Sequence, residues 1–430
     1  MAKRHLVMLG LLAGGAVAFS ACTTSTSSDG GAGAPNGEAG AANGEAGAPG
    51  AAGSSGEAGS AEAGAAGSGT PMFADALNPQ GVIVTAAEPS GSTRLLVAGT
   101  DYTVSTEVAN LTLATGTVED TTVYNDGDAV ATSSAGLGFV IERTNDLVHL
   151  LNGSASKTTF DLKDLGTGKA VALADKAYVP LLKESLITVL DLKAGTVSKR
   201  IDLSRYSASA DTDGSADIDA GVYDAKKKIA YFLLGRIDFN SFDSQFHLPC
   251  SKTKALVVGI NATTDEVVDL NGDADGEAAE LSLTNPKSVA LAADGTLVVL
   301  SNGCYSAGKL TNQGIENLDP TTGVSTTVYA PKNDDYLADL ILTGGTNALL
   351  GTKDSIYAPH WYKFDLAAGM LGDELLNVPG AVSFDGTNLL GVGTGGEVIK
   401  YTLATGKDST VAAKSWAGDY DSAVSTALVK

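Results

Sequence analysis

The chain has 430 residues, of which 18% are charged and 6% aromatic, and its formal net charge at pH 7 is −22. So acidic a protein is poorly suited to binding nucleic acid or to docking on anionic lipid by charge. Four histidines and three cysteines occur, without the spacing of a nucleophile elbow, a zinc-protease motif or a haem-attachment site. These features predict neither nucleic-acid binding nor enzymatic activity, and no motif indicates a cofactor.

Residues 1–21 have the pattern of a secretory signal peptide. A basic stretch at residues 3–5 precedes an apolar run from Leu6 to Phe19. This run is too short to span a bilayer, because a membrane helix needs roughly 20 apolar residues. We therefore predict export and removal of this segment.

The apolar run is followed by Ser20-Ala21-Cys22, which resembles the lipobox of bacterial lipoproteins, with Phe19 in the place usually held by leucine. The resemblance implies cleavage before Cys22, a diacylglycerol on its thiol and an anchor of two or more acyl chains in the membrane. Thr23 in place of aspartate favours the outer membrane, so the cell envelope is the expected location. The alternative is an ordinary signal peptide with an incidental cysteine.

The segment that follows the cysteine, within residues 22–70, has the composition of a flexible tether. From Thr23 to Thr70 there is no Val, Ile, Leu, Met, Phe, Trp or Tyr, and Gly, Ala and Ser dominate. Such a segment cannot bury enough apolar surface to offset the entropy of ordering it, so we predict disorder. Its expected r.m.s. length is roughly 35–40 Å.

The remaining residues, 71–430, have an all-β pattern. Short runs of Val, Ile, Leu, Thr and Tyr alternate with turns rich in Gly, Asp and Asn. One phrase, a strand followed by a tight turn that usually carries Gly or Thr, occurs seven times at intervals of about 51 residues. The copies are Asn110–Gly116, His149–Gly153, Val189–Gly195, Val258–Thr264, Asn317–Gly323, Lys363–Gly369 and Lys400–Gly406.

A second unit, two strands around a polar turn, precedes the copies, as at Ser288–Leu300 and Ala381–Val392. Two pairs of strands per repeat form a four-stranded blade, so residues 71–430 are predicted to form a seven-bladed β-propeller. The phrase Asp-Leu-x-x-Gly-x-Val at Asp191–Val197 resembles the strand turn of the YVTN and quinoprotein-like propellers. That resemblance implies a fold and hardly a function. A pair of β-sandwiches is the competing architecture.

Cys250 and Cys304 are the only cysteines of the predicted domain, in long loops at corresponding places of the fourth and fifth blades. An exported domain with two cysteines favours a disulfide between them. The bond would close a loop of about 55 residues and stabilise the fold by roughly 4 kcal/mol on the chain-entropy model. Two separate buried thiols are the alternative.

Loops of the fourth and sixth blades supply candidate ligand contacts, because the loops of one propeller face converge on the channel mouth. The fourth-blade loop carries Arg236, Phe239, Phe242 and His247. The sixth-blade loop carries Tyr357, His360 and Trp361, whose rings are suited to stacking on a flat ligand. The alternative for Trp361 is a place in a strand that packs between blades.

An acidic stretch that we expect to connect two blades has the oxygen spacing of an EF-hand-like calcium loop. Its candidate ligands are Asp269, Asn271, Asp273, Asp275 and Glu280. Ala274 departs from the glycine that such a loop needs, and no helices flank it. A solvated acidic loop without metal is the alternative.

These features favour a monomeric, membrane-anchored binding or scaffold lipoprotein that presents its loops to a protein or small-molecule partner not identified by the sequence. The alternative is an accessory lipoprotein of outer-membrane siderophore or other small-molecule uptake, a role that similar tethered propellers suggest. A hydrolase or lyase that uses His247 or His360 with a nearby carboxylate is a third hypothesis.

Overall fold

The computed structural model describes residues 93–429 except 102, 164–165, 209–211, 244–246, 251–252, 273–277, 307–308, 333–334, 355–357, 380–381, 394–395 and 413–421. The predicted signal peptide (1–21), Cys22, the tether (22–70) and the start of the predicted domain lie outside these residues. Within them, no helix has the length and apolar character needed to cross a membrane. The helical elements of the described residues are two short 3₁₀ turns, η2 (Ser204–Tyr206) and η3 (Phe239–Ser241).

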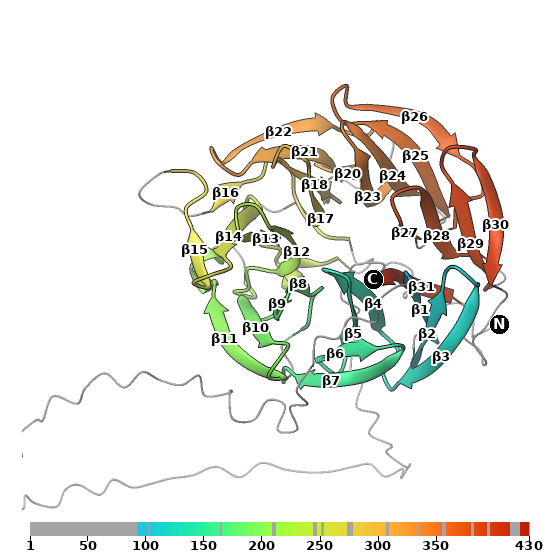
Figure 1. Cartoon of the computed structure of the whole chain (residues 1–430). Helices are drawn as coiled ribbons and strands as arrows, with labels where there is room; N and C mark the ends of the chain where they lie inside the picture. Colours follow the sequence, from blue (N-terminus) through green and yellow to red (C-terminus); the bar gives the residue numbers. More distant parts are fainter. Residues whose placement is uncertain are drawn as a thin grey trace, which may run out of the picture. The chain divides into compact units, whose positions relative to one another are not determined.

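The described residues form seven antiparallel sheets, six of four strands and one of five, arranged as the blades of a ring (Figure 1). Blade one combines β1 (Arg94–Thr100), β2 (Thr106–Thr112), β3 (Thr117–Tyr124) and β31 (Ser422–Val429). Blade two consists of β4 (Ala129–Ser134), β5 (Leu137–Glu142), β6 (Leu147–Asn152) and β7 (Ala155–Asp161). Blade three consists of β8 (Val171–Leu173), β9 (Lys176–Leu181), β10 (Leu186–Asp191) and β11 (Thr196–Asp202).

The remaining blades follow the same order. Blade four has β12 (Ile218–Asp224), β13 (Ile229–Leu234), β14 (Leu256–Asn261), β15 (Glu266–Val268) and β16 (Ala279–Glu280). Blade five has β17 (Pro286–Leu291), β18 (Leu297–Ser301), β21 (Gly314–Asp319) and β22 (Val324–Tyr329), with the hairpin β19 (Cys304–Ser306) and β20 (Lys309–Thr311) beside it. Blade six has β23 (Tyr336–Gly344), β24 (Asn347–Lys353), β25 (Pro359–Asp365) and β26 (Met370–Leu375). Blade seven has β27 (Val382–Phe384), β28 (Asn388–Val392), β29 (Val398–Thr402) and β30 (Lys407–Ala412).

The ring is closed by strands from the two ends of the described chain. The C-terminal strand β31 pairs antiparallel with β1, from Arg94↔Val429 to Thr100↔Ser422, and is the innermost strand of blade one. Innermost strands of successive blades lie next to one another, so that β12 contacts β8 on one side and β17 on the other. The predicted seven-bladed propeller is confirmed, and the pair of β-sandwiches is excluded.

The hydrophobic core lies between blades, because successive side chains of a strand point to opposite faces of its sheet. Strand β1 shows this directly. Leu95 belongs to a cluster with Leu390 of blade seven, and Leu96 belongs to a cluster with Val140 of blade two. Full burial of one such leucine stabilises the fold by about 1.5–3 kcal/mol.

The repeated turn of the sequence joins the third and fourth strands of a blade. In blade three, Asp191 Oδ1 accepts hydrogen bonds from the backbone N–H groups of Lys193 (2.9 Å) and Ala194 (2.7 Å). Gly195 then closes the turn with a φ of 71°, a conformation that side chains disfavour. The Asp-x-x-x-Gly phrase therefore specifies the turn through its own hydrogen bonds.

This strand order divides the connections between two faces of the ring. Turns between strands one and two, and between three and four, lie on one face. Connections between strands two and three, and between successive blades, lie on the other, which we call the loop face. The loop face carries the longest connections and is where the candidate site lies.

Candidate binding face

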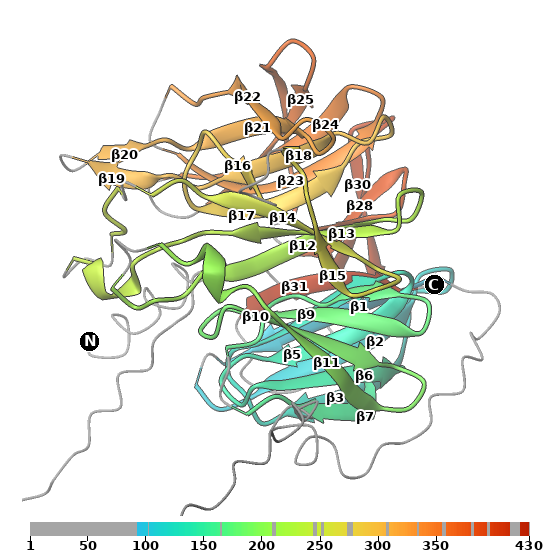
Figure 2. The same ribbon diagram turned by 90° about the vertical axis from the view of Figure 1, so that its left-hand side faces the viewer.

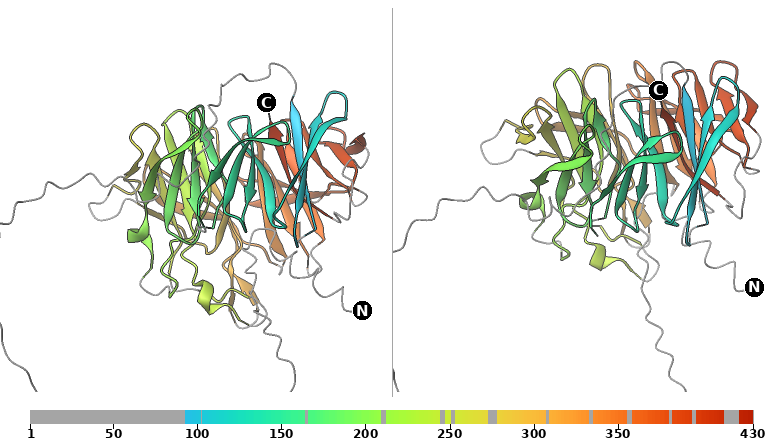
Figure 3. Two further views of the ribbon diagram at one scale, coloured as in Figure 1. Left: turned by 90° about the horizontal axis from the view of Figure 1, so that it is seen from below. Right: turned by 60° about the horizontal axis from the view of Figure 1, so that its bottom comes forward.

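Two long connections project from the loop face of blades four and five as one structure, which we call the lobe. The first is residues 235–255, between β13 and β14, and it contains η3. The second is residues 302–313, between β18 and β21, and it contains the hairpin β19–β20. Figure 2 and Figure 3 show the hairpin and η3 extending beyond the ends of the blade strands. The lobe is the place predicted for most of the candidate ligand contacts.

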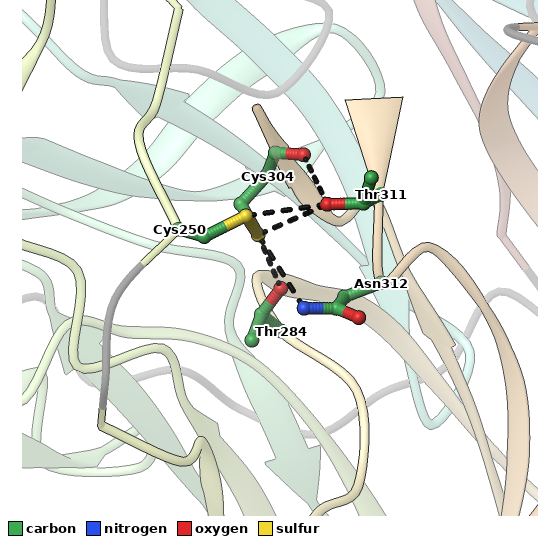
Figure 4. Close-up of a disulfide and its surroundings, with 5 residues drawn as sticks. All are labelled: Cys250, Thr284, Cys304, Thr311 and Asn312. Carbon is green, nitrogen blue, oxygen red and sulfur yellow. Dashed lines mark hydrogen bonds between the residues drawn. A yellow bond between two sulfur atoms is a disulfide. The ribbon is translucent and has the colours of Figure 1, made fainter. Parts of the chain in front are cut away.

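A disulfide between Cys250 and Cys304 joins the two connections, with the Cα atoms 4.8 Å apart (Figure 4). The hydroxyl of Thr311 lies 3.3 Å from Cys250 Sγ, and the hydroxyl of Thr284 lies 3.3 Å from Cys304 Sγ. Cys304 is 1% exposed, so the bond lies inside the lobe. The predicted pairing is confirmed, and the alternative of two separate thiols is excluded.

Backbone hydrogen bonds extend the link beyond the disulfide. Tyr305 N donates to Leu248 O (2.7 Å), and Cys250 N donates to Tyr305 O (3.2 Å), which forms a parallel bridge between the two connections. Gly303, just before the disulfide, has a φ of 74°. A Cβ atom at this position would lie 2.2 Å from Thr311 O, so only glycine fits.

Aromatic side chains cover the lobe and connect it to blade six. The rings of His247 and Tyr305 stack at a centroid distance of 4.0 Å, and His247 Nδ1 lies 3.1 Å from Asp243 Oδ2. The Tyr305 hydroxyl forms a hydrogen bond with that of Tyr336, the first residue of β23. His247 is thereby held between a carboxylate and a ring, with 30% of its side chain exposed.

The other predicted residues of this loop are also in the lobe. Phe239 and Phe242 stack on each other at 5.7 Å, and both are half-buried. Arg236 donates to the carbonyl oxygen of Lys254 (3.1 Å) and so ties the two ends of the first connection together. The structure therefore places Phe239 and Phe242 in one stacked pair and His247 in another with Tyr305, and gives Arg236 a contact at the base of the loop.

The sixth-blade residues are separated from one another. Tyr357 lies outside the described residues. His360 on β25 has its Nδ1 2.7 Å from Glu374 Oε1 and its Nε2 3.6 Å from Asp354 Oδ2. The hydrogen bond with Glu374, followed by that with Asp354, raises the pKa of His360 above its usual value. This residue carries a pH-dependent charge on the loop side of blade six.

Trp361 is placed differently from our expectation of a channel-mouth residue. Its side chain is 3% exposed and packs with Leu375, Leu389 and Tyr401 between blades six and seven. The reason is the alternation of the strand, since Trp361 follows His360 on β25 and points to the opposite face of the sheet. Trp361 is a core residue, as the alternative interpretation held.

The acidic stretch interrupts a strand and does not connect two blades, which corrects our expectation of its place. Both β15 and β16 pair with β14, so residues 269–278 are an insertion in the outermost strand of blade four. Asp269 Oδ1 accepts the N–H groups of Asn271 (3.0 Å) and Gly272 (2.8 Å). Glu280 Oε2 lies 2.6 Å from Lys254 Nζ.

Metal binding by this insertion stays a prediction. Asp273 and Asp275 lie outside the described residues. Among the residues that are described, no three or more His, Cys, Asp or Glu side chains form a group suited to a metal ion.

A set of charged residues at the start of the innermost strands was missed by the sequence analysis; we call it the mouth ring. It contains Asp128 paired with Arg143 (blade two), Lys169 (blade three), Asp219 (blade four), Lys287 (blade five) and Asp339 (blade six). The Lys287–Asp219 ion pair, at 2.5 Å, joins two blades. Register shifts at Ile218/Gly221 and Pro286/Ser288 mark bulges that contain Asp219 and Lys287.

The charges of the mouth ring act on one another across the ring. Burial opposes ionisation of Asp219, but nearby cations, Lys287 first and Lys169 next, outweigh it and lower the pKa of this carboxyl. Burial raises the pKa of Asp339, and Lys169 counteracts part of that effect. A sequence signal exists: a charged residue stands two places before valine in Asp128-Ala-Val, Lys169-Ala-Val and Lys287-Ser-Val.

No family model matches the chain, and no curated protein matches it. Solved structures are similar in fold. Dihydro-haem d1 dehydrogenase NirN in complex with DHE matches with a TM-score of 0.51 at 11% identity, over 81% of this chain and 78% of that chain. BamB from Moraxella catarrhalis matches at 0.43 and 16% identity, over 69% and 81%. The Cps50 (Swd1) β-propeller domain from Myceliophthora thermophila matches at 0.46 and 13%, over 75% and 94%. At these identities the likeness concerns the β-propeller fold alone.

Proposed function

We propose that this protein is an extracytoplasmic, membrane-anchored binding lipoprotein whose lobe is the contact surface for a protein partner. The observation that carries the proposal is the disulfide-linked lobe. Cross-linking and backbone bridging order the two connections before any partner arrives, so less conformational entropy is lost on binding. Binding residues are concentrated on loops that a rigid scaffold holds in position.

The side chains of the lobe suit a protein interface. Phe239, Phe242, His247 and Tyr305 are half-buried, so each offers a partly exposed ring that is already held in place. Rigid aromatic side chains are enriched at the centres of protein interfaces, where they contribute much of the binding energy. The net charge of −22 favours a partner with a basic surface and an association rate that falls as salt is added.

The proposed location rests on two features of the chain. A disulfide persists in oxidising compartments, which supports a site outside the cytoplasm. The resemblance of Ser20-Ala21-Cys22 to a lipobox supports an acyl anchor, with the tether as spacer, and Thr23 in place of aspartate favours the outer membrane. Acylation of Cys22 is tested by mass spectrometry of the N-terminal peptide from the purified full-length protein, and a free thiol there would exclude the anchor.

The binding role is tested with the full-length protein in its own membranes. A partner is cross-linked to the wild type and identified, and the yield is compared for a Phe239→Ser/Phe242→Ser variant. We expect a loss of at least tenfold, since interface aromatics contribute about 2 kcal/mol or more each. The matched control is Val324→Ser/Met370→Ser, which changes two exposed hydrophobic residues of outer strands, 60% and 62% exposed, and should keep the partner.

The same experiment separates the alternatives. Equal yields from the lobe variant and the wild type would exclude the lobe as the contact surface. A coloured or fluorescent small molecule that copurifies with the wild type, without a protein partner, would favour the uptake-accessory role.

A further inference from the structure

A chain of hydrogen bonds in blade two links a carboxylate, an imidazole and an exposed hydroxyl. Glu142, at the end of β5, places Oε1 2.9 Å from Nε2 of His149 on β6. His149 Nδ1 lies 3.2 Å from Ser156 Oγ and 3.0 Å from Thr159 Oγ1, both on β7. The order acid, base, hydroxyl is that of an activated serine.

The direction of these hydrogen bonds makes Nδ1 of His149 an acceptor that can act as a base. Burial works against ionised Glu142, but hydrogen bonds from His149 and Asn145 outweigh it and lower the pKa of the carboxyl. An ionised carboxylate only accepts hydrogen bonds, so His149 Nε2 carries the proton in this contact. In the neutral ring Nδ1 is then an acceptor, and it receives a hydrogen bond from the hydroxyl of Ser156 or Thr159.

A bulge in the outer strand brings these two hydroxyls together. The pairing of β6 with β7 shifts between Leu150 and Leu151, which leaves one extra residue in β7. Residues 156 and 159 are three apart and would point to opposite faces of a regular strand. The bulge places both on one side, where the two hydroxyl oxygens lie 2.9 Å apart.

The base is buried, whereas the hydroxyl that it would activate is exposed. Glu142 is 4% exposed and His149 is 6% exposed, and the His149 ring packs against Tyr124 of blade one at 4.9 Å. Ser156 is exposed on β7, the outermost strand of the blade. A reagent from solution therefore reaches the hydroxyl, while water has little access to the base behind it.

We infer that Ser156 is a nucleophile that takes an acyl group from a small activated ester. The Oγ–carbonyl carbon bond forms and the carbon–oxygen bond to the leaving group breaks. The serine proton passes to His149 Nδ1 and then to the departing oxygen. Water reverses the sequence, releases the acid and restores the hydroxyl. This activity goes beyond the proposed partner binding and lies on a different blade from the lobe.

The neighbouring blade supplies a matched control for the inference. Ser198 is also exposed on an outermost strand, β11 of blade three, but its hydroxyl donates to Val189 O (3.1 Å) and, among the described residues, contacts no histidine. Thr159 supplies a second control, because its hydroxyl competes with Ser156 for the same nitrogen. Replacing Thr159 by valine leaves that nitrogen to Ser156.

The test uses p-nitrophenyl acetate with the full-length protein, and follows p-nitrophenolate release and the acetylated residue by peptide mass mapping. We expect acetylation of Ser156 at least tenfold faster than of Ser198, and its loss in Ser156→Ala. His149→Gln and Glu142→Gln should slow it by at least tenfold, since a positioned base contributes about 10²–10⁴ in rate. Thr159→Val should raise the rate, because its hydroxyl no longer competes with Ser156 for His149 Nδ1.

The comparison of two serines within one wild-type molecule does not depend on whether the buried variants fold. Equal acetylation of Ser156 and Ser198, or a nitrophenolate rate unchanged by Ser156→Ala, would overturn the inference.

Discussion

At the scale of single residues, His360 makes the clearest link between geometry and a measurable property. It lies between Glu374 and Asp354, with 32% of its side chain exposed. The hydrogen bond with Glu374 raises the pKa of His360 above the value of about 6.5 that an unfolded chain would show. The folded state therefore binds this proton more tightly, and protonation stabilises the fold.

The stability that His360 contributes is fully present below pH 6.5 and is lost as the pH rises through the raised pKa of the folded state. We expect the melting temperature of the wild type to fall over that interval, and the fall to be smaller in His360→Gln. The pair is exposed, so the effect corresponds to about 0.2–1 kcal/mol. Scanning calorimetry between pH 5.5 and 8.5 measures it, with Glu374→Gln as a second variant that should behave alike. A pH dependence identical in wild type and His360→Gln would contradict the assignment.

The residues that could be predicted from the sequence are those whose evidence is local. The two cysteines and the aromatic residues of one loop occur close together or at matching places in the repeat, so the lobe could be expected. The prediction that Trp361 lines the channel mouth was wrong, because the face of the sheet to which its side chain points depends on register. The interactions of the mouth ring could not be predicted from the sequence. Lys169, Asp219 and Asp339 lie far apart in the chain and interact only when the propeller closes.

At the scale of elements, the turns explain why seven blades could be counted. Each turn is specified by a few neighbouring residues, as the hydrogen bonds of Asp191 show. Bulges and insertions are less visible, because they depend on which residue of the partner strand is skipped. The insertion at 269–278 therefore looked like a connection between blades, although Leu256 and Val257 pair with the strand that follows it.

The disulfide gives a prediction at this scale. Cys304→Ser opens a closed loop with a sequence separation of 54 residues, which costs about 4 kcal/mol on the chain-entropy model. We expect a lower midpoint in guanidinium unfolding and faster hydrogen exchange in residues 235–255 and 302–313 than in the blades. Cys250→Ser and the double variant should match the single variant, because each removes the same bond. If the double variant lost about as much stability as the sum of the two single variants, this explanation would be contradicted.

At the scale of the whole molecule, stability depends on closing the ring. Each blade buries its two faces against its neighbours, so a ring with one missing strand exposes apolar surface on two blades at once. Blade one is completed by β31, whose Ala427 and Val429 are buried with Leu96 and Val140 between blades one and two. The strand also covers the inner edge of β1, which would otherwise offer unpaired backbone groups to other chains.

Removing residues 413–430 therefore tests closure. We expect this truncation to lower the melting temperature by about 5 °C or more, since several kcal/mol are lost and each changes the midpoint by roughly 1–2 °C in a domain of more than 300 residues. Aggregation should rise as well, because β1 gains a free edge. The control deletes residues 23–70, which have no large apolar side chain, and should leave the melting temperature of the propeller within about 1 °C. A truncated protein that melts at the wild-type temperature would show that the blades are stable without closure, and a large effect of the control deletion would show that the tether contributes to the fold.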